Sequence, residues 1–238
     1  MSPAATGGTA NATITIVRAP RVHPLALYRD APASVRVHVW LRWQTCPFWE
    51  VARAAPVEGS VLEIGCGHGL LATSLALDSR RREVLGIDVD IRKIWGALCA
   101  ARNATLVGAN LRFDQAAPGH LPAGPWDCIA IADVLYLLDP RNQRQLLQEC
   151  AARLAPKGTL LIKEMALRPR WKFRWNVLQE TISVRWLGLT LWERHPFTFV
   201  PPAELARWLR QAGLEVEFRS LDAGYLHPHL LLVGRRLD

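Results

Sequence analysis

Short apolar runs alternate with stretches of helical character along most of this chain. Runs at 61–64, 84–87, 110–113 and 127–136 predict buried strands, the last together with its exit loop, and a fifth strand is expected at 159–164. Segments 70–75 and 141–154 between these runs predict helices, and further strands are expected at 214–221 and from 227 onward. This alternation predicts an α/β fold with a mostly parallel sheet.

The first apolar run breaks into a glycine-rich turn, Gly65-Cys66-Gly67-His68-Gly69. Glycines at alternate positions permit backbone angles closed to other residues, and without a Cβ they let a ligand contact the main chain. The turn therefore indicates a cofactor site. A dinucleotide fold would normally show G-x-G-x-x-G, whereas here the glycines lie at alternate positions and follow Glu63.

The second apolar run ends in Asp88, where a neighbouring parallel strand would place its carboxyl end beside the glycine turn. An acid at that place can accept hydrogen bonds from both ribose hydroxyls of a nucleoside cofactor. The alternative is that Asp88 caps the next helix, because Asp is a favoured N-cap residue, and Asp90 is a second candidate for that cap. An NAD enzyme would share this acid, so Asp88 does not identify the cofactor.

The order acid-x-Gly-x-Gly-x-Gly, from Glu63 to Gly69, resembles motif I of the class I S-adenosylmethionine (SAM) dependent methyltransferases. Trp126-Asp127 at the start of the fourth strand, Asp133 at its end and the segment 154–158, with a loop at 155–158 before the fifth strand, resemble later motifs of the small-molecule members. The resemblance extends over 61–235. It implies a Rossmann-like sheet of seven mostly parallel strands in the order 3-2-1-4-5-7-6, with strand 7 antiparallel and helices on both faces.

The resemblance also implies SAM as the cofactor and a set of residues that bind it. The acid before the turn would lie near the methionine amino end, the glycines under the adenosine, and the acid after the second strand at the ribose. The implied cofactor residues are Glu63, Gly65, Cys66, Gly67, Gly69, Asp88, Val89, Asp114, Gln115 and Asp133.

One part of the family pattern is altered. After the third strand the family commonly carries a Gly-Asp pair whose acid meets the adenine amino group, but this chain has Asp114-Gln115-Ala116-Ala117. The acid is therefore missing or displaced to Asp114. Main-chain groups near Gln115 and Ala116 are the alternative means of adenine recognition.

Candidate catalytic residues come from strand ends that the fold brings to one rim. The fifth strand ends at Glu164, and the seventh begins around His227-Pro228-His229. Histidine titrates near neutrality and can take a proton from a hydroxyl, so His229 is the preferred general base, with His227 second and Glu164 as an orienting group. Tyr136 either lines the methyl-transfer channel or belongs to the core.

A Trp- and Arg-rich insert at about 165–200 separates the fifth strand from the last helix. On a helix, Trp171, Trp175 and Trp186 would share one apolar stripe. We expect a lid over the substrate cleft, with peripheral contact to a membrane surface, because tryptophan and arginine favour anionic bilayer interfaces. The alternatives are packing within the domain and a homodimer interface.

Composition narrows the class of protein. The chain has 238 residues and a net charge of +8, and no apolar run approaches the length of a membrane span. Positive charge alone identifies no partner, and the exit of the fourth strand lacks the Asn-Pro-Pro-Tyr type sequence of amino methyltransferases acting on nucleic-acid bases. Five scattered cysteines without a C-x-x-C spacing indicate neither disulfides nor a metal site.

These features predict a flexible tail over 1–20 and one methyltransferase domain over 21–238, in a cytoplasmic protein that contacts the inner face of the membrane peripherally. The expected reaction transfers a methyl group from SAM to a small-molecule or lipid-like acceptor, with oxygen slightly favoured as the methylated atom. The alternative is a SAM-fold module without catalysis that acts in a complex or at a membrane surface. A nucleic-acid methyltransferase is disfavoured.

Overall fold

The computed structural model describes residues 22–165, 197–222, 225 and 229–237. The tail expected over 1–20 and most of the insert expected at 165–200 lie outside the described residues, and so does His227.

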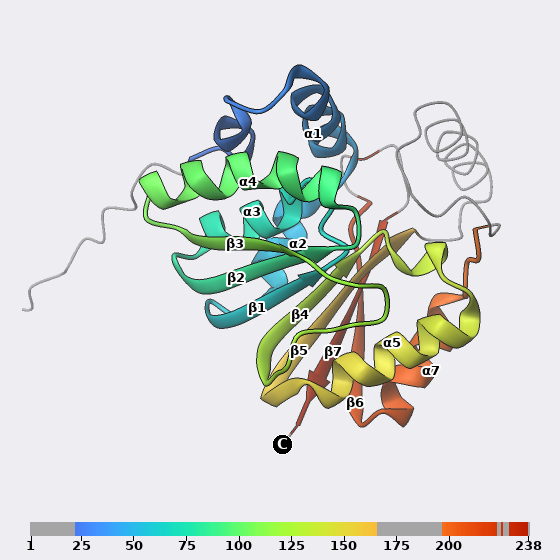
Figure 1. Ribbon diagram of the computed structural model, residues 1–238. Coiled ribbons are helices and arrows are strands. Elements are labelled where there is room, and N and C mark those ends of the chain that lie inside the picture. Colours follow the sequence, from blue (N-terminus) through green and yellow to red (C-terminus); the bar gives the residue numbers. More distant parts are fainter. Residues whose placement is uncertain (1–21, 166–196, 223–224, 226–228, 238) are drawn as a thin grey trace, which may run out of the picture.

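Seven strands form one sheet in the order β3-β2-β1-β4-β5-β7-β6. Strands β1 to β5 pair in parallel, and β7 runs antiparallel between β5 and β6 (Figure 1). This order confirms the topology implied by the sequence motifs. The strands are β1 (Glu58–Ile64), β2 (Arg81–Asp88), β3 (Asn110–Gln115), β4 (Trp126–Ala132), β5 (Leu154–Met165), β6 (Leu214–Ser220) and β7 (His229–Arg236).

Helices cover both faces of the sheet (Figure 1). Alternate residues of the strands point to opposite faces, so that Val61 packs with the helices before β3 and Leu62 packs with those after β4. The first face carries η1 (Pro24–Tyr28), α1 (Ala33–Thr45), α2 (Phe48–Ala54), α3 (Leu70–Asp78) and α4 (Ile91–Leu106). The second carries α5 (Pro140–Ala152) and α7 (Pro202–Gln211), and a short 3-10 helix, η2 (Leu135–Leu137), follows β4.

Two boundaries differ from the sequence prediction. A loop was expected at 155–158, between a helix ending at Leu154 and a strand beginning at Thr159, but β5 already begins at Leu154, which pairs with Trp126. The next β4 residue in register, Cys128, pairs with Thr159, so the intervening residues bulge out of the strand. Lys157 has a φ of 62°, which bends the backbone at this bulge. In addition, the predicted fourth strand ends at Ala132, and η2 forms within its expected exit loop.

The segment 34–43, whose pattern fitted a strand or a helix, lies within α1. Val35 and Val39 are buried on its inner side, four residues apart as a helix requires. Within the part of the chain that the structure describes, every helix is too short or too polar to cross a bilayer.

Candidate cofactor and acceptor site

The glycine turn is fixed to the end of β2 by main-chain hydrogen bonds. The amides of Gly65 and Cys66 donate to the carbonyl of Ile87 at 2.8 and 2.9 Å. The three glycines of the turn have φ values of 71°, 55° and 79°, in the left-handed region that favours glycine. A Cβ added at Gly67 would meet no atom within 4 Å, so the turn presents an open backbone surface at this residue.

Glu63 lies beneath the turn with its carboxylate at the start of α3. The carboxylate accepts a hydrogen bond from the amide of Ala72 at 2.7 Å, in the first turn of a helix, where amides have no partner within the helix. The side chain is buried, and this burial raises the pKa of Glu63 to about 8 despite that hydrogen bond. A buried carboxyl of this kind favours a neighbouring cation.

Asp88 links the glycine turn to the start of α4. One carboxylate oxygen accepts from the amide of Gly67 and the other from that of Asp90, both at 2.8 Å. The N-cap of α4 is Asp90, whose side chain accepts from the Arg92 amide at 3.0 Å. Of the two candidate caps, Asp90 therefore performs this role. Each oxygen of Asp88 has a second lone pair that can accept from a hydroxyl.

The end of β3 lies beside Asp88. The amide of Ala116 donates to the main-chain carbonyl of Asp88 at 3.0 Å, and the side-chain amide of Gln115 donates to the carbonyl of Val89 at 3.2 Å. The side chains of Asp114 and Gln115 are exposed. The structure thus brings these candidate adenine-binding residues next to Asp88 and Val89.

A buried ion cluster follows β4. Asp133 has a φ of 57°, and its carboxylate accepts from the Lys163 ammonium at 2.6 and 2.7 Å and from Arg42 of α1 at 2.7 Å. Burial alone would raise the pKa of Asp133, but the charges of Lys163 and Arg42 outweigh burial and lower this pKa well below its usual range. The cluster fastens α1 to the ends of β4 and β5.

Glu164 points to the opposite face of the sheet from Lys163, because successive residues of β5 alternate. Its carboxylate accepts from the amide of Leu135 in η2 at 3.3 Å. Burial, followed by the negative charge of Asp133, raises the pKa of Glu164 to about 8. Near neutral pH this group holds a proton.

Tyr136 is buried among aromatic rings on the same side as Glu164. Its ring stacks on Phe199 at a centroid distance of 5.3 Å and meets Phe197 edge-on at 5.5 Å. The Tyr136 carbonyl accepts from the amide of Thr198 at 2.9 Å. These contacts join η2 to the chain that leads into α7.

His229 begins β7 opposite Met165, the last residue of β5. Its Nε2 lies 2.8 Å from the carbonyl oxygen of Thr45 at the end of α1. Because a carbonyl can only accept, this contact assigns the proton to Nε2 and makes Nδ1 the basic nitrogen of the neutral ring. The Tyr225 ring meets the imidazole edge-on at 5.5 Å.

Sequence reasoning did not single out three residues of this region: Arg42, His38 and His68. The rings of His38 and His68 meet edge-on at 4.9 Å, joining α1 to the glycine turn. Burial, followed by the charge of His68, lowers the pKa of His38 to about 4. Their partners come from distant parts of the chain, so the only sequence signal was the position of His68 within the turn.

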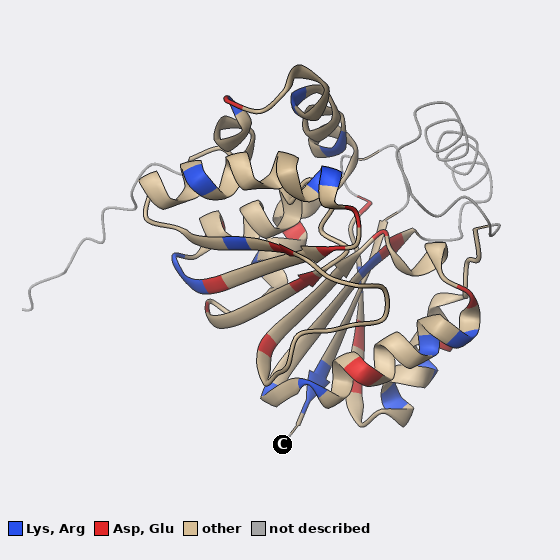
Figure 2. Cartoon of the chain, in the orientation of Figure 1, with Lys and Arg blue, Asp and Glu red and all other residues tan. Residues whose placement is uncertain are grey.

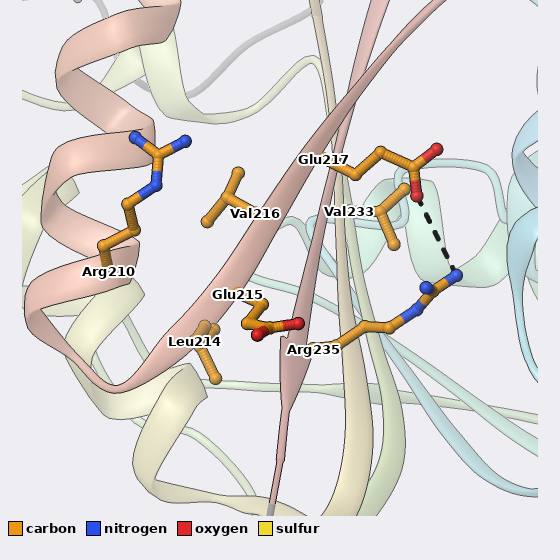
Figure 3. A pocket seen from close by; sticks show the side chains of 7 residues that line it. All are labelled: Arg210, Leu214, Glu215, Val216, Glu217, Val233 and Arg235. Carbon is orange, nitrogen blue, oxygen red and sulfur yellow. Dashed lines mark ion pairs between the residues drawn. The ribbon is translucent and has the colours of Figure 1, made fainter.

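Charged positions of both signs gather where β1, β2, β4 and β5 end (Figure 2). The structure therefore brings the described candidates for cofactor binding and catalysis to one edge of the sheet, where ligands of open α/β folds bind. A pocket lies elsewhere, at the beginning of β6, and Figure 3 shows Glu217 and Arg235 forming an ion pair of 4.0 Å in its lining. This pocket is at the amino ends of the parallel strands and is separate from the candidate site.

Comparison with known proteins agrees with this arrangement. A methyltransferase domain family matches residues 45–217, and the chain belongs to this family. One relative, a ubiquinone biosynthesis O-methyltransferase of Xanthomonas axonopodis pv. citri, is 30% identical over 167 residues, which cover 70% of this chain and 66% of the relative. A protein of the same description from Acinetobacter baylyi is 26% identical over 161 residues, or 66% of this chain and 63% of the relative.

The matching region spans slightly less than two thirds of these curated relatives. Among solved structures, an O-methyltransferase family protein from Burkholderia thailandensis aligns with a TM-score of 0.64 at 21% identity, covering 86% of this chain and 58% of that one. Magnesium protoporphyrin IX methyltransferase of Synechocystis aligns with a TM-score of 0.59 at 18% identity, covering 89% and 91%. These structural likenesses establish the methyltransferase fold.

Proposed function

We propose that this protein is a SAM-dependent O-methyltransferase that acts on a small-molecule or lipid-like acceptor. The observation that carries the proposal is the open backbone surface at Gly67, flanked by the carboxylate of Asp88, on the sheet edge where the ends of β4, β5 and β7 supply charged and polar side chains. Membership of the methyltransferase family and the names of the relatives support the same reaction.

The residues around the turn are chemically suited to SAM. The open surface at Gly67 accommodates a flat nucleoside, and Asp88 can accept from ribose hydroxyls. Glu63 would release its proton readily beside the ammonium of the methionine portion. When bound, SAM supplies an electrophilic methyl group on its sulfonium. The roles of Val89, Asp114 and Gln115 at the adenine remain predictions.

The acceptor would bind at the ends of β4, β5 and β7. There Lys163 and Arg42 both pair with Asp133, so this cluster of two cations and one carboxylate carries a net positive charge, which favours an acceptor with an ionised or ionisable oxygen. His229 would take the proton of an acceptor hydroxyl at Nδ1, while the hydrogen bond from Nε2 to Thr45 holds the ring. Correct placement of the hydroxyl in line with the methyl group supplies much of the rate.

Thermal stabilisation by SAM and by its demethylated product, S-adenosylhomocysteine, tests the cofactor. Both compounds should raise the melting temperature, whereas NAD should not. Asp88→Asn should weaken the shift, and Glu83→Gln, an exposed substitution on the same strand, should not. Stabilisation by NAD alone would contradict the proposal.

Labelled SAM incubated with cell extract tests the reaction and reveals the acceptor. His229→Gln should retain stabilisation by S-adenosylhomocysteine but lose roughly 10²-fold in turnover at saturating SAM, as is typical when a general base is removed. Unchanged turnover of His229→Gln would show that His229 is not the general base. Cofactor binding without methyl transfer would instead favour a non-catalytic module.

The sequence of the insert supports a further part of the proposal, peripheral contact with the inner face of the membrane. Its tryptophans and arginines are the residue types that favour an anionic bilayer interface. Flotation with anionic vesicles tests this contact, and failure to float would remove it while leaving the enzymatic proposal intact. A homodimer built through the insert would appear as a doubled mass in solution.

A further inference from the structure

Helix α4 carries an apolar stripe on its outer side. Ile91, Trp95, Leu98 and Leu106 recur at helical spacing on one face, and their exposed fractions are 42%, 70%, 47% and 72%. The inner side of the same helix buries Ile94, Ala97, Ala100 and Ala104. A helix that is apolar on two faces is normally enclosed on both, so the outer stripe has the character of a contact surface.

The charges along α4 are all positive. The helix contains Arg92, Lys93 and Arg102 and no acidic residue. Two acids beside the helix pair with two of these basic residues, Asp90 with Arg92 at 2.9 Å and Asp30 with Arg102 at 3.7 Å. Asp30 also pairs with Arg29. These pairs reduce the positive charge beside the stripe, but the four basic residues, Arg29 included, still outnumber the two acids.

The stripe begins next to the candidate site. Ile91 is the first residue of α4, directly after Asp90, whose amide donates to the carboxylate of Asp88. The helix has 16 residues and extends about 24 Å at the usual rise per residue. A surface that covers the stripe would thus lie beside the edge of the sheet where the cofactor residues gather (Figure 1).

We propose that this face of α4, formed by Ile91, Trp95, Leu98 and Leu106 with Arg92 and Arg102, docks on an anionic lipid surface. Indole and aliphatic side chains partition into the headgroup region, and flanking arginines attract anionic headgroups. The proposal rests on the peripheral membrane contact inferred above and gives that contact a surface among the described residues. It would present the site directly to an acceptor held in the bilayer.

Charge complementarity distinguishes a lipid surface from other occupants. A second copy docking through the same face would bring two helices without acids against each other, which like charges oppose. A nucleic acid would satisfy the arginines but not the aliphatic positions Ile91, Leu98 and Leu106. An anionic bilayer satisfies both groups of side chains.

The test uses the full chain and flotation with phosphatidylcholine vesicles, with or without phosphatidylglycerol. The protein should float only with the anionic vesicles, and added salt should weaken binding because it screens the arginines. Trp95→Ser combined with Leu98→Ser should weaken binding roughly tenfold or more, since the variant loses two apolar side chains that the bilayer would bury. Phe218→Ser, at an exposed apolar position of β6, is the matched control and should bind as the unaltered protein does.

Stabilisation by S-adenosylhomocysteine should be the same for all these variants, which verifies that they are folded and that the cofactor proposal is unaffected. Equal flotation of the double variant would overturn the α4 surface while leaving membrane contact to the insert. No flotation by the unaltered protein would overturn both membrane proposals.

Other results would identify another occupant of the stripe. Flotation that appears only after deletion of residues 1–20 would show that the chain's own beginning covers the stripe. A dimer that is lost in the double variant would identify a second copy as the occupant. A single-stranded oligonucleotide bound through the stripe, with vesicles ignored, would identify a nucleic acid.

Discussion

Gly67 and Gly69 have similar backbone angles but different surroundings. Both have positive φ values, 55° and 79°. An added Cβ at Gly67 would meet open space, whereas at Gly69 it would overlap the ring of Phe113. The first glycine therefore leaves room for a ligand, and the second leaves room for the core.

This difference predicts different effects of two alanine substitutions, one mainly on ligand binding and the other mainly on stability. Gly67→Ala should cost about 1 to 2 kcal/mol in unfolding free energy, for the left-handed backbone, and should abolish most of the stabilisation by S-adenosylhomocysteine. Gly69→Ala should lower stability considerably more, because it adds a steric conflict in the core. Denaturant unfolding with and without the ligand measures both. Normal ligand stabilisation of Gly67→Ala would contradict the assignment of the open backbone surface at Gly67 to the cofactor.

At the same scale, sequence reasoning identified residues next to motifs but missed those defined by long-range contact. Glu63 could be singled out because it precedes the glycine turn, and Asp88 because it ends the second apolar run. Arg42 pairs with Asp133, 91 positions later, and a pairing over that separation leaves no local pattern. The same applies to the contact of His229 with Thr45, which assigns the imidazole proton.

At the scale of the element, α1 is the part that the sequence left open between strand and helix. Val35, Val37, Val39 and Leu41 alternate with polar residues as in a strand, yet Val35 and Val39 also share one side of a helix. Packing decides the outcome, since Val35 and Val39 are buried while Val37 and Leu41 are exposed. The early start of β5 was missed because its bulge contains the turn-forming residues Pro156 and Gly158.

Helix α1 is held to the sheet edge at its C-terminal end by Arg42 and by the Thr45 carbonyl. Arg42→Gln should remove one ion pair of Asp133 while Lys163 remains, and should cost about 1 to 3 kcal/mol in unfolding free energy, because the site is partly buried. Hydrogen exchange should accelerate in α1 more than in β1 or β4. Arg36→Gln, at an exposed position of the same helix, is the control. Equal acceleration throughout the sheet would show that Arg42 does not hold α1 specifically.

At the scale of the whole molecule, the sheet order followed from the resemblance of the motifs and is confirmed in every strand pairing. Apolar runs separated by helical segments predict parallel strands, but their order in the sheet does not follow from periodicity. That order came from the family motifs. The insert, for which the sequence supplied only hypotheses, lies mostly outside the described residues.

The buried acids give the whole molecule a characteristic dependence on pH. Burial raises the pKa of Glu63 and of Glu164 to about 8. Both carboxyls hold a proton in the folded protein at neutral pH and lose it on unfolding. The folded state therefore binds more protons, and stability must fall as pH rises toward 8.

Other groups set the lower limit of the pH range in which this effect can be measured. Burial lowers the pKa of His38 and of His68, so these side chains take up protons on unfolding and reduce stability as pH falls below the ordinary histidine pKa of about 6.5. Between about pH 6.5 and 8 the two glutamates dominate. Denaturant unfolding of the ligand-free protein should show a loss of about 1 to 2 kcal/mol for each glutamate over that range.

Glutamine substitution separates this effect from the rest of the protein. Glu63→Gln and Glu164→Gln keep an oxygen that can accept from the amides of Ala72 and Leu135 but have no proton to lose. Each variant should flatten the pH dependence by its own share, and the double variant should remove the slope. Glu215→Gln, at an exposed position of β6, should leave the slope unchanged. A double variant that retains the full slope would show that these two carboxyls are already ionised in the folded protein at neutral pH, so that another group must supply the dependence.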